Sequence, residues 1–517
     1  MLYEKNIFRK DYRKIDIRFG LCYPNIYRTA MSSLGYNILY NLINEREDTW
    51  CERIIYPDTK SLESNTSGRH FDILSFTIQF EEDYFNLLEI LRDSRIPLKR
   101  KDRGKNDPLI IAGGPCATAN PMPLSDYIDL FIIGEGEDTV NELLDVYKNS
   151  QNSSLEKFLD IEGIYIPEFD NETRIRKIEH MDSSYHITQP IISKSDEDDY
   201  QSIFNNTIML NVSRGCTRGC RFCMAGYLYR PMRQTDWKKL IDVAIENRKN
   251  TGLNKVTLIG AAVSDYNNLD KLIDGLESEG FQISTPSLRI ESITENTLKT
   301  LKKSGLKTIT LAPESIDRLR KVINKEILEE QIFTVIKNAS ELDFNIKLYF
   351  LIGIPGESID DIRELCEYMK KIADLHKNPS KVKFSVNPLI PKPHTPLQWE
   401  GYDFKDIKKK TRYIKKEMKN YNIKCESPKK GLVQYILSCG DKSVSTLIEK
   451  SLTKKPTLKE WQELTPNYDL GDLLPWNNID IGVSERFLKI ENKRLKNLKQ
   501  TPWCENSPCY NCGACEK

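Results

Sequence analysis

The chain has 517 residues, of which 39% are hydrophobic and 29% are charged, and its formal net charge is +1. These values are typical of ordinary globular proteins, and the nearly balanced charge argues against a protein that binds nucleic acids through its overall charge. The length suffices for about two to four domains, each with a core of its own.

Cysteine usage and the N-terminus indicate the cellular compartment. Of the 13 cysteines, seven lie in two short clusters, a distribution that favours metal ligation in a reducing compartment over a framework of disulfides. The N-terminus lacks the apolar region of a signal peptide, and no apolar run is long enough to span a bilayer. We therefore expect a cytoplasmic protein with no membrane partner.

Residues 1–195 alternate short apolar runs with amphipathic segments. Strands are expected at 16–23, 72–78, 108–112 and 130–133, and helices follow the first, second and fourth of them. This alternation predicts an α/β protein that begins with a Rossmann-like, doubly wound parallel sheet and a linker. Gly113 and Gly114 end the third strand, at the carboxyl edge where such sheets bind ligands.

A loop with three cysteines follows the apolar run 207–212, which reads as a buried strand. Cys216, Cys220 and Cys223 have the spacing C-x3-C-x2-C. Three thiolates on one loop can hold three corners of a [4Fe–4S] cluster and leave the fourth iron open to a small molecule. Zinc sites take a fourth ligand, and none follows here at the usual spacing. The alternative is three buried structural cysteines.

Residues 196–400 repeat the strand–helix pattern. Strands are expected at 207–212, 255–260, 281–290, 306–311, 345–352 and 381–386, which gives six βα units where a complete TIM barrel has eight. Ligands of such barrels lie at the carboxyl ends of the strands.

Residues 401–517 are expected to be mostly helical, and they carry an excess of Lys and Arg. This excess is compatible with an anionic substrate or simply with solvated helix faces. The tail contains Cys504, Cys509, Cys512 and Cys515 at C-x4-C-x2-C-x2-C spacing. Four thiolates suit either zinc or an iron–sulfur cluster, and the compact spacing favours iron and sulfur.

The run from Ser213 to Cys223 resembles the radical S-adenosylmethionine (SAM) superfamily, whose motif carries an aromatic residue where Phe222 stands. The segments 109–115 and 131–137 resemble the cobalamin-binding domain that often precedes a radical SAM barrel. With the Cys-rich C-terminus, the order of parts resembles an uncharacterised group of radical SAM proteins with a cobalamin (B12)-binding-like domain. The Asp-x-His-x-x-Gly motif of cobalt-ligating domains is missing, so a Rossmann-like domain without the cofactor stays as the alternative.

The resemblance implies a partial (β/α)6 TIM-type barrel and SAM contacts at its strand ends. Arg289 would pair with the SAM carboxylate, or instead with Glu291 or Glu314 in a structural salt bridge. Gly113 and Gly114 would lie against the nucleotide tail of cobalamin. The other residues expected to contact SAM are Phe222, Gly260, Ser264, Glu314, Ser315 and Gly353.

The resemblance also implies an enzyme that uses a [4Fe–4S] cluster to cleave SAM to a 5′-deoxyadenosyl radical. The electron would come from reduced flavodoxin or ferredoxin. Cobalamin would make methyl transfer the natural outcome. Two alternatives are a methylthiotransferase-like modification of RNA or protein, with an RNA or ribosome-related substrate, and a non-enzymatic iron–sulfur or cobalamin sensor. The sequence assigns neither a substrate nor a catalytic residue.

Overall fold

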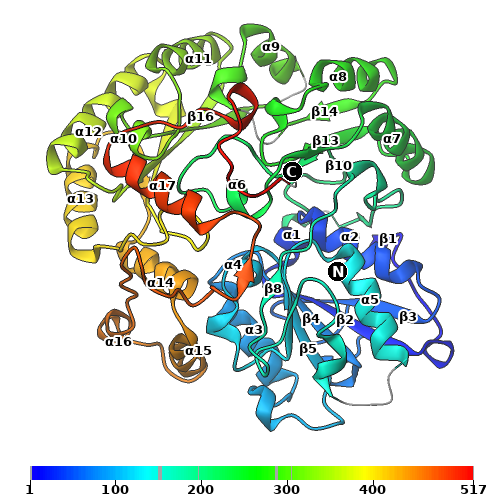
Figure 1. Ribbon diagram of the computed structural model, residues 1–517. Helices are drawn as coiled ribbons and strands as arrows, with labels where there is room; N and C mark the ends of the chain where they lie inside the picture. Colours follow the sequence, from blue (N-terminus) through cyan, green and yellow to red (C-terminus); the bar gives the residue numbers. More distant parts are fainter. Residues whose placement is uncertain (1–2, 150–153, 196, 286–288, 304–305, 516–517) are drawn as a thin grey trace.

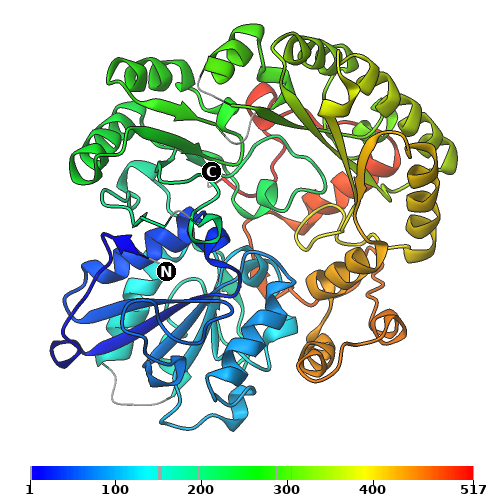
Figure 2. The ribbon, with the colours of Figure 1, turned by 180° about the vertical axis from the view of Figure 1, so that it is seen from behind.

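The computed structural model describes residues 3–149, 154–195, 197–285, 289–303 and 306–515. Two α/β parts lie side by side, and a C-terminal segment crosses back over both of them (Figure 1). In the view from behind, the helices of the second part form an arc outside its strands (Figure 2). No helix among the described residues is both long and apolar enough to cross a membrane.

The first part contains a six-stranded sheet in the order β3-β2-β4-β5-β6-β7, with only β7 antiparallel to its neighbour. Its strands are β2 (Ile17–Tyr23), β3 (Thr49–Ile55), β4 (Ile73–Thr77), β5 (Leu109–Gly113), β6 (Leu130–Ile132) and β7 (Ile164–Tyr165). Its main helices are α2 (Leu34–Glu45), α3 (Asp83–Asp93), α4 (Pro115–Ala119) and α5 (Gly136–Asn149). The predicted doubly wound sheet is confirmed, and its four predicted strands are β2, β4, β5 and β6.

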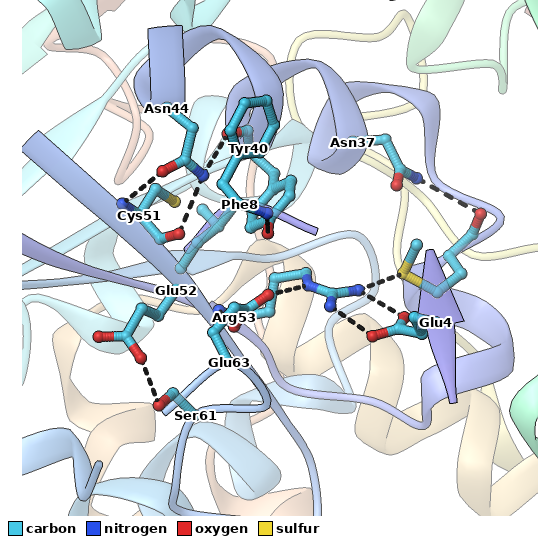
Figure 3. Close-up of polar contacts among 12 residues, drawn as sticks. Glu4, Phe8, Asn37, Tyr40, Asn44, Cys51, Glu52, Arg53, Ser61 and Glu63 are labelled. Carbon is cyan, nitrogen blue, oxygen red and sulfur yellow. Dashed lines mark hydrogen bonds and ion pairs between the residues drawn. The ribbon is translucent and has the colours of Figure 1, made fainter. Parts of the chain in front are cut away.

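The edge strand β3 was not predicted, because two charged residues interrupt its apolar pattern. Arg53 in this strand is fully buried, and its guanidinium pairs with Glu63 at 2.7 Å and with Glu4 at 2.6 Å (Figure 3). Glu4 comes from β1 (Glu4–Lys5), near the start of the chain. Burial raises the pKa of Glu63 even though Arg53 faces it. This ion triad therefore fastens the N-terminal segment to the edge of the sheet.

The second part is an open barrel made of two parallel sheets. One is β10 (Ile208–Asn211), β13 (Lys255–Ile259) and β14 (Gln282–Ser284); the other is β15 (Thr308–Glu314), β16 (Asn345–Ile352), β17 (Val382–Pro388) and β18 (Asn422–Cys425). Within the described ranges no hydrogen-bonded ladder joins β14 to β15, and residues 286–288 of the predicted third strand lie outside those ranges. The helices on the outer side are α7 (Trp237–Thr251), α8 (Leu269–Ser278), α9 (Glu295–Lys303), α11 (Glu329–Glu341), α12 (Ile359–Asp374) and α13 (Phe404–Glu417).

The alternation of side chains along β16 shows how the barrel wall is built. Ile346, Leu348, Phe350 and Ile352 are buried and belong to one core with residues of α11 and α12. The intervening residues Lys347, Tyr349 and Leu351 lie on the opposite face of the strand. Strand β18 adds a seventh parallel strand beyond residue 400, where mostly helices were expected. It is short and only half-buried, so its apolar pattern is weak.

The C-terminal segment returns from the rim of the barrel to its centre. After α14 (Pro428–Cys439), α15 (Ser445–Ser451) and α16 (Leu458–Glu463), the strand β19 (Ile479–Asp480) pairs with β8 (Thr173–Arg174). Helix α17 (Glu485–Lys496) then packs against α10 (Asp317–Val322), which follows the carboxyl end of β15. The tail beyond α17 ends near α6 (Ala225–Leu228), in the middle of the molecule (Figure 1).

Candidate active site at the cysteine loop

The cysteine loop leaves the carboxyl end of β10 and is closed at its base by a short antiparallel ladder. Strand β11 (Ser213–Arg214) pairs there with β12 (Arg233–Gln234). Gly215 has φ +81°, and a side chain at this position would collide with the carbonyl oxygen of Tyr229. Only glycine fits this turn without strain, because its left-handed backbone and the close approach exclude a Cβ atom.

Two cations face the three thiols. Burial raises the pKa of Cys220 to about 12, while Lys325 and Arg289 act in the opposite direction, and Cys216 and Cys223 lie within electrostatic range. No three His, Cys, Asp or Glu side chains of the described chain are close enough to share a single metal ion. An iron–sulfur cluster has several metal atoms and holds its thiolates further apart. Three cysteines with neighbouring cations fit such an anionic cluster.

Arg221, between the second and third cysteines, anchors the loop from behind. Its side chain is fully buried and pairs with Glu491 of α17 at 3.1 Å. The same guanidinium donates hydrogen bonds to the carbonyl oxygens of Val322 at 2.8 Å and Lys499 at 2.6 Å. The loop is therefore fixed to α10, to α17 and to the tail through one side chain.

The tail itself lies on the cysteine loop. Asn324 donates to the carbonyl oxygens of Gly219 and Thr501, at 3.1 Å each, so one amide group bridges the loop and the tail. Thr217 also donates a hydrogen bond to Glu505 at 3.3 Å. The guanidinium of Arg218 stacks on the ring of Trp503, with its Cζ atom 3.0 Å from the ring centroid, and pairs with Asp265. Residues 499–505 thus form one wall of the loop, although nearly 300 positions separate the contacting residues.

Two of the residues expected to contact SAM lie near the thiols. Glu314 ends β15 in a left-handed backbone conformation with φ +64°, and its carboxylate accepts from Lys325 at 2.6 Å. Such strain in a non-glycine residue is typical of functional sites. Arg289 pairs with Glu291 at 2.8 Å, the ion pair that the sequence analysis gave as the alternative to the SAM carboxylate. If SAM binds here, Glu314 would share Lys325 with the ligand, and Glu291 would share Arg289 with it.

The other predicted contacts occupy different surroundings. The buried hydroxyls of Ser264 and Ser315 find no hydrogen-bond partner among the described residues. Phe222 is half-buried against the main core. Gly353 has φ +80°, and its backbone N–H donates to the carboxylate of Glu357 at 2.7 Å, so turn formation alone explains a glycine at this position.

A cavity of about 590 Å³ lies between the two α/β parts. On one side it is lined by Gly113 and Gly114 after β5, and on the other by Gly215 and Gly260. Gly114 has φ +98°, and a Cβ atom there would lie 2.6 Å from the carbonyl oxygen of Ile78. The predicted glycine turn of the first part and the base of the cysteine loop therefore face one common space.

Ion pairs hold the two walls of this cavity together. Glu135, in the turn after β6, pairs with Arg214 at 3.3 Å and with Arg233 at 2.7 Å, and Arg214 also pairs with Glu137 at 2.6 Å. All four residues are largely buried, and each charge has a partner of opposite sign. Sequence does not reveal these pairs, since Arg214 and Arg233 lie about 80 and 100 positions beyond Glu135.

Comparisons with known proteins agree with this arrangement. A family model described as radical SAM proteins, N-terminal, matches residues 35–167, and the radical SAM superfamily model matches residues 210–369. The uncharacterised protein MJ0966 of Methanocaldococcus jannaschii is 34% identical over 448 residues, which cover 85% of this chain and 91% of that protein. The chain belongs to the radical SAM superfamily, whose members are enzymes that use a [4Fe–4S] cluster and SAM.

Two further similarities are more distant. The uncharacterised methyltransferase PH0819 of Pyrococcus horikoshii is 24% identical over 283 residues, 51% of this chain and 58% of that protein. The radical SAM methyltransferase TsrM of Kitasatospora setae, solved with cobalamin and a [4Fe–4S] cluster, has a TM-score of 0.53 at 12% identity over 75% of this chain and 78% of that one. This second likeness shows that the fold is shared.

Proposed function

We propose that this protein cleaves SAM reductively at a [4Fe–4S] cluster held by Cys216, Cys220 and Cys223. The observation that supports this function is the convergence of three thiols with Lys325 and Arg289 at the carboxyl ends of the barrel strands. A cluster held there would pass one electron from a reduced flavodoxin or ferredoxin to the sulfonium of SAM, so that the C5′–S bond would break to give methionine and a 5′-deoxyadenosyl radical. The chain's own residues hold the carboxylate and amino groups of SAM in place and exclude water. A sensor without enzymatic activity would bind SAM but not consume it.

We further propose that the interdomain cavity binds cobalamin and that the reaction is a methyl transfer. The cavity extends from the glycine turn of the first sheet to the base of the cysteine loop. A cobalamin bound in it would therefore lie next to the proposed cluster and SAM site. None of the described residues that line it is a histidine, which agrees with the missing Asp-x-His-x-x-Gly motif. The apolar walls and glycine turns suit a large, flat ligand whose cobalt has no protein imidazole.

Gly35 offers a direct test of cobalamin binding. It lies in the first turn of α2 and lines the cavity, and a Cβ atom placed there meets no atom within 4 Å. The variant Gly35→Trp should therefore fold and narrow the cavity at this wall. We expect its affinity for hydroxocobalamin, measured anaerobically by absorbance, to fall at least about 10-fold, since each 1.4 kcal/mol of lost binding gives that factor.

Gly401→Trp is the matched control, because a Cβ atom there also meets nothing within 4 Å while the residue lies outside the cavity lining. It should bind hydroxocobalamin as the unmodified chain does. If the unmodified chain does not bind, or if Gly35→Trp binds equally well, the cavity is not a cobalamin site.

A second candidate function, methylthiotransferase-like modification of RNA, is favoured by a basic face on α13. Lys405, Lys408, Lys409, Arg412 and Lys416 follow one another at helical spacing and line a groove of about 800 Å³. None of these five side chains forms an ion pair with a described carboxylate. Unpaired cations on one helix face are the electrostatic footprint of a polyanion such as RNA.

Charge reversal tests this surface. We expect Lys405→Glu/Lys409→Glu to weaken binding of a structured RNA by about 10-fold at low salt and to reduce the salt dependence of binding, because two phosphate contacts are lost. Filter binding or fluorescence anisotropy at several salt concentrations measures both effects. Lys429→Glu/Lys430→Glu carries the same charge change on exposed residues outside the groove. Equal affinities of the two variants would contradict an RNA site on α13.

A further inference from the structure

The four cysteines of the tail have no part in the function proposed so far. We propose that Cys504, Cys509, Cys512 and Cys515 hold a second iron–sulfur cluster, directly beside the cysteine loop of the first. This inference takes the first cluster from the proposed function, but it does not depend on cobalamin or on methyl transfer.

The tail cysteines gather in one docked turn. Cys515 interacts electrostatically with the other three thiols. Cys512 is buried, and its carbonyl oxygen accepts a hydrogen bond from the backbone of Ser484 at 2.8 Å. Tyr510 stacks on Phe487 of α17 with ring centroids 5.3 Å apart and planes 7° from parallel. The turn is thus part of the packed structure, and all four cysteines are free thiols.

Gly513 explains how the chain can make this turn. Its φ is +96°, and a Cβ atom there would lie 2.8 Å from the carbonyl oxygen of Gly482. The backbone therefore passes close to the segment before α17, between the last two cysteines. A turn that brings four thiols together and presses the backbone onto the protein is what a cluster with four cysteine ligands requires.

A buried cation between the two cysteine groups is the independent observation. Arg230 is 3% exposed, interacts with Cys512, and donates to the carbonyl oxygen of Thr217 at 3.5 Å. Its Nε and Nη1 atoms have no hydrogen-bond partner among the described residues. Unsatisfied donors of a buried guanidinium are costly. Anionic sulfur atoms on the side of Cys512 would satisfy them and balance the charge.

The choice of iron and sulfur over zinc follows from spacing. Zinc holds four thiolates around a single atom, about 2.3 Å from each. The four tail cysteines fall within twelve residues, without the second, separated C-x2-C pair that is common in zinc sites. This compact spacing favours a centre with several metal atoms. Arg230 contacts Thr217 of the first loop and lies near Cys512 of the tail, so the two clusters would be neighbours.

Metal analysis of the full chain, reconstituted anaerobically with iron and sulfide, tests the proposal. We expect Cys504→Ser/Cys512→Ser to lose about two or about four iron atoms per chain, according to cluster type, and to keep the signal of the first cluster. Cys425→Ser, at a half-buried cysteine outside both groups, should lose none. Unchanged iron in the double variant, or zinc in place of iron in the unmodified tail, would overturn the proposal.

A second variant leaves the tail unchanged, so its result does not depend on whether the tail substitutions disturb folding. Cys216→Ser/Cys220→Ser/Cys223→Ser should retain iron and an iron–sulfur absorption band held by the tail alone, whereas a chain without iron would refute the second cluster. This result does not depend on SAM cleavage, so failure of the proposed function and failure of the second cluster can be told apart.

Substitutions of Arg230 test whether the second cluster lies beside this side chain. Removing its charge in Arg230→Gln should shift the midpoint potential of the second cluster to a more negative value, because a neighbouring cation stabilises the reduced form. Arg230→Lys should restore most of the shift. Identical potentials in the three proteins would show that the second cluster does not lie beside Arg230.

Discussion

Cys220→Ala is expected to abolish the formation of 5′-deoxyadenosine from SAM and dithionite, down to the level seen without protein. Cys220 is the middle cysteine of the loop and lies within electrostatic range of both neighbouring thiols and both cations. Two remaining cysteines cannot hold a cluster with one open iron, because the chain would then have to leave two irons unligated. Iron content should fall together with activity, by about four atoms per chain.

Cys366→Ala serves as the control, because this cysteine is buried in the barrel core on α12, away from the loop. It should lose some stability but retain SAM cleavage per folded chain. Product formation by Cys220→Ala, quantified by chromatography, would contradict the assignment of the loop as the cluster site.

The second large effect is expected at Arg53, in the first sheet. Arg53→Met leaves the carboxylates of Glu4 and Glu63 buried without their shared cation. Removing one partner of a buried ion pair typically costs about 3–5 kcal/mol. The first unfolding transition in urea should move to a correspondingly lower concentration, and the N-terminal segment should become more sensitive to proteases.

An exposed arginine gives the matched comparison. Arg13 pairs with Asp11 at 2.8 Å, but its side chain is 73% exposed. Arg13→Met should therefore leave the unfolding transition where it is, since exposed ion pairs contribute little. Equal shifts for the two substitutions would mean that the buried triad does not stabilise the sheet.

The comparison of these regions shows what the sequence can predict. Strands β2, β4, β5 and β6, and the barrel strands up to β17 other than the short β14, have apolar runs with helices between them, and this local pattern suffices to locate them. Strand β3 lacks that pattern because Glu52 and Arg53 interrupt it, and both charges are neutralised only by residues distant in sequence. Strand β18 is too short and too exposed to have a pattern.

The candidate site likewise combines features that the local sequence predicts with features that depend on distant residues. The cysteine spacing is a local signal, and it located the loop at the end of β10. The partners of the loop are not local: Arg221 reaches Glu491, and Arg230 reaches Cys512. The left-handed conformation of Glu314 also depends on tertiary packing, since few sequences favour it on their own. The position of the cysteine loop is therefore predictable from the sequence, whereas the residues that hold the loop in place are not.

The contacts between the tail and the cysteine loop have a consequence for how the site is assembled. Residues 499–505, which form one wall of the loop, follow the first sheet and the barrel strands in the chain. The wall therefore closes only when a segment nearly 300 positions further along the chain docks on the loop. A truncation before residue 499 would leave Cys216, Cys220 and Cys223 in place on a loop without this wall.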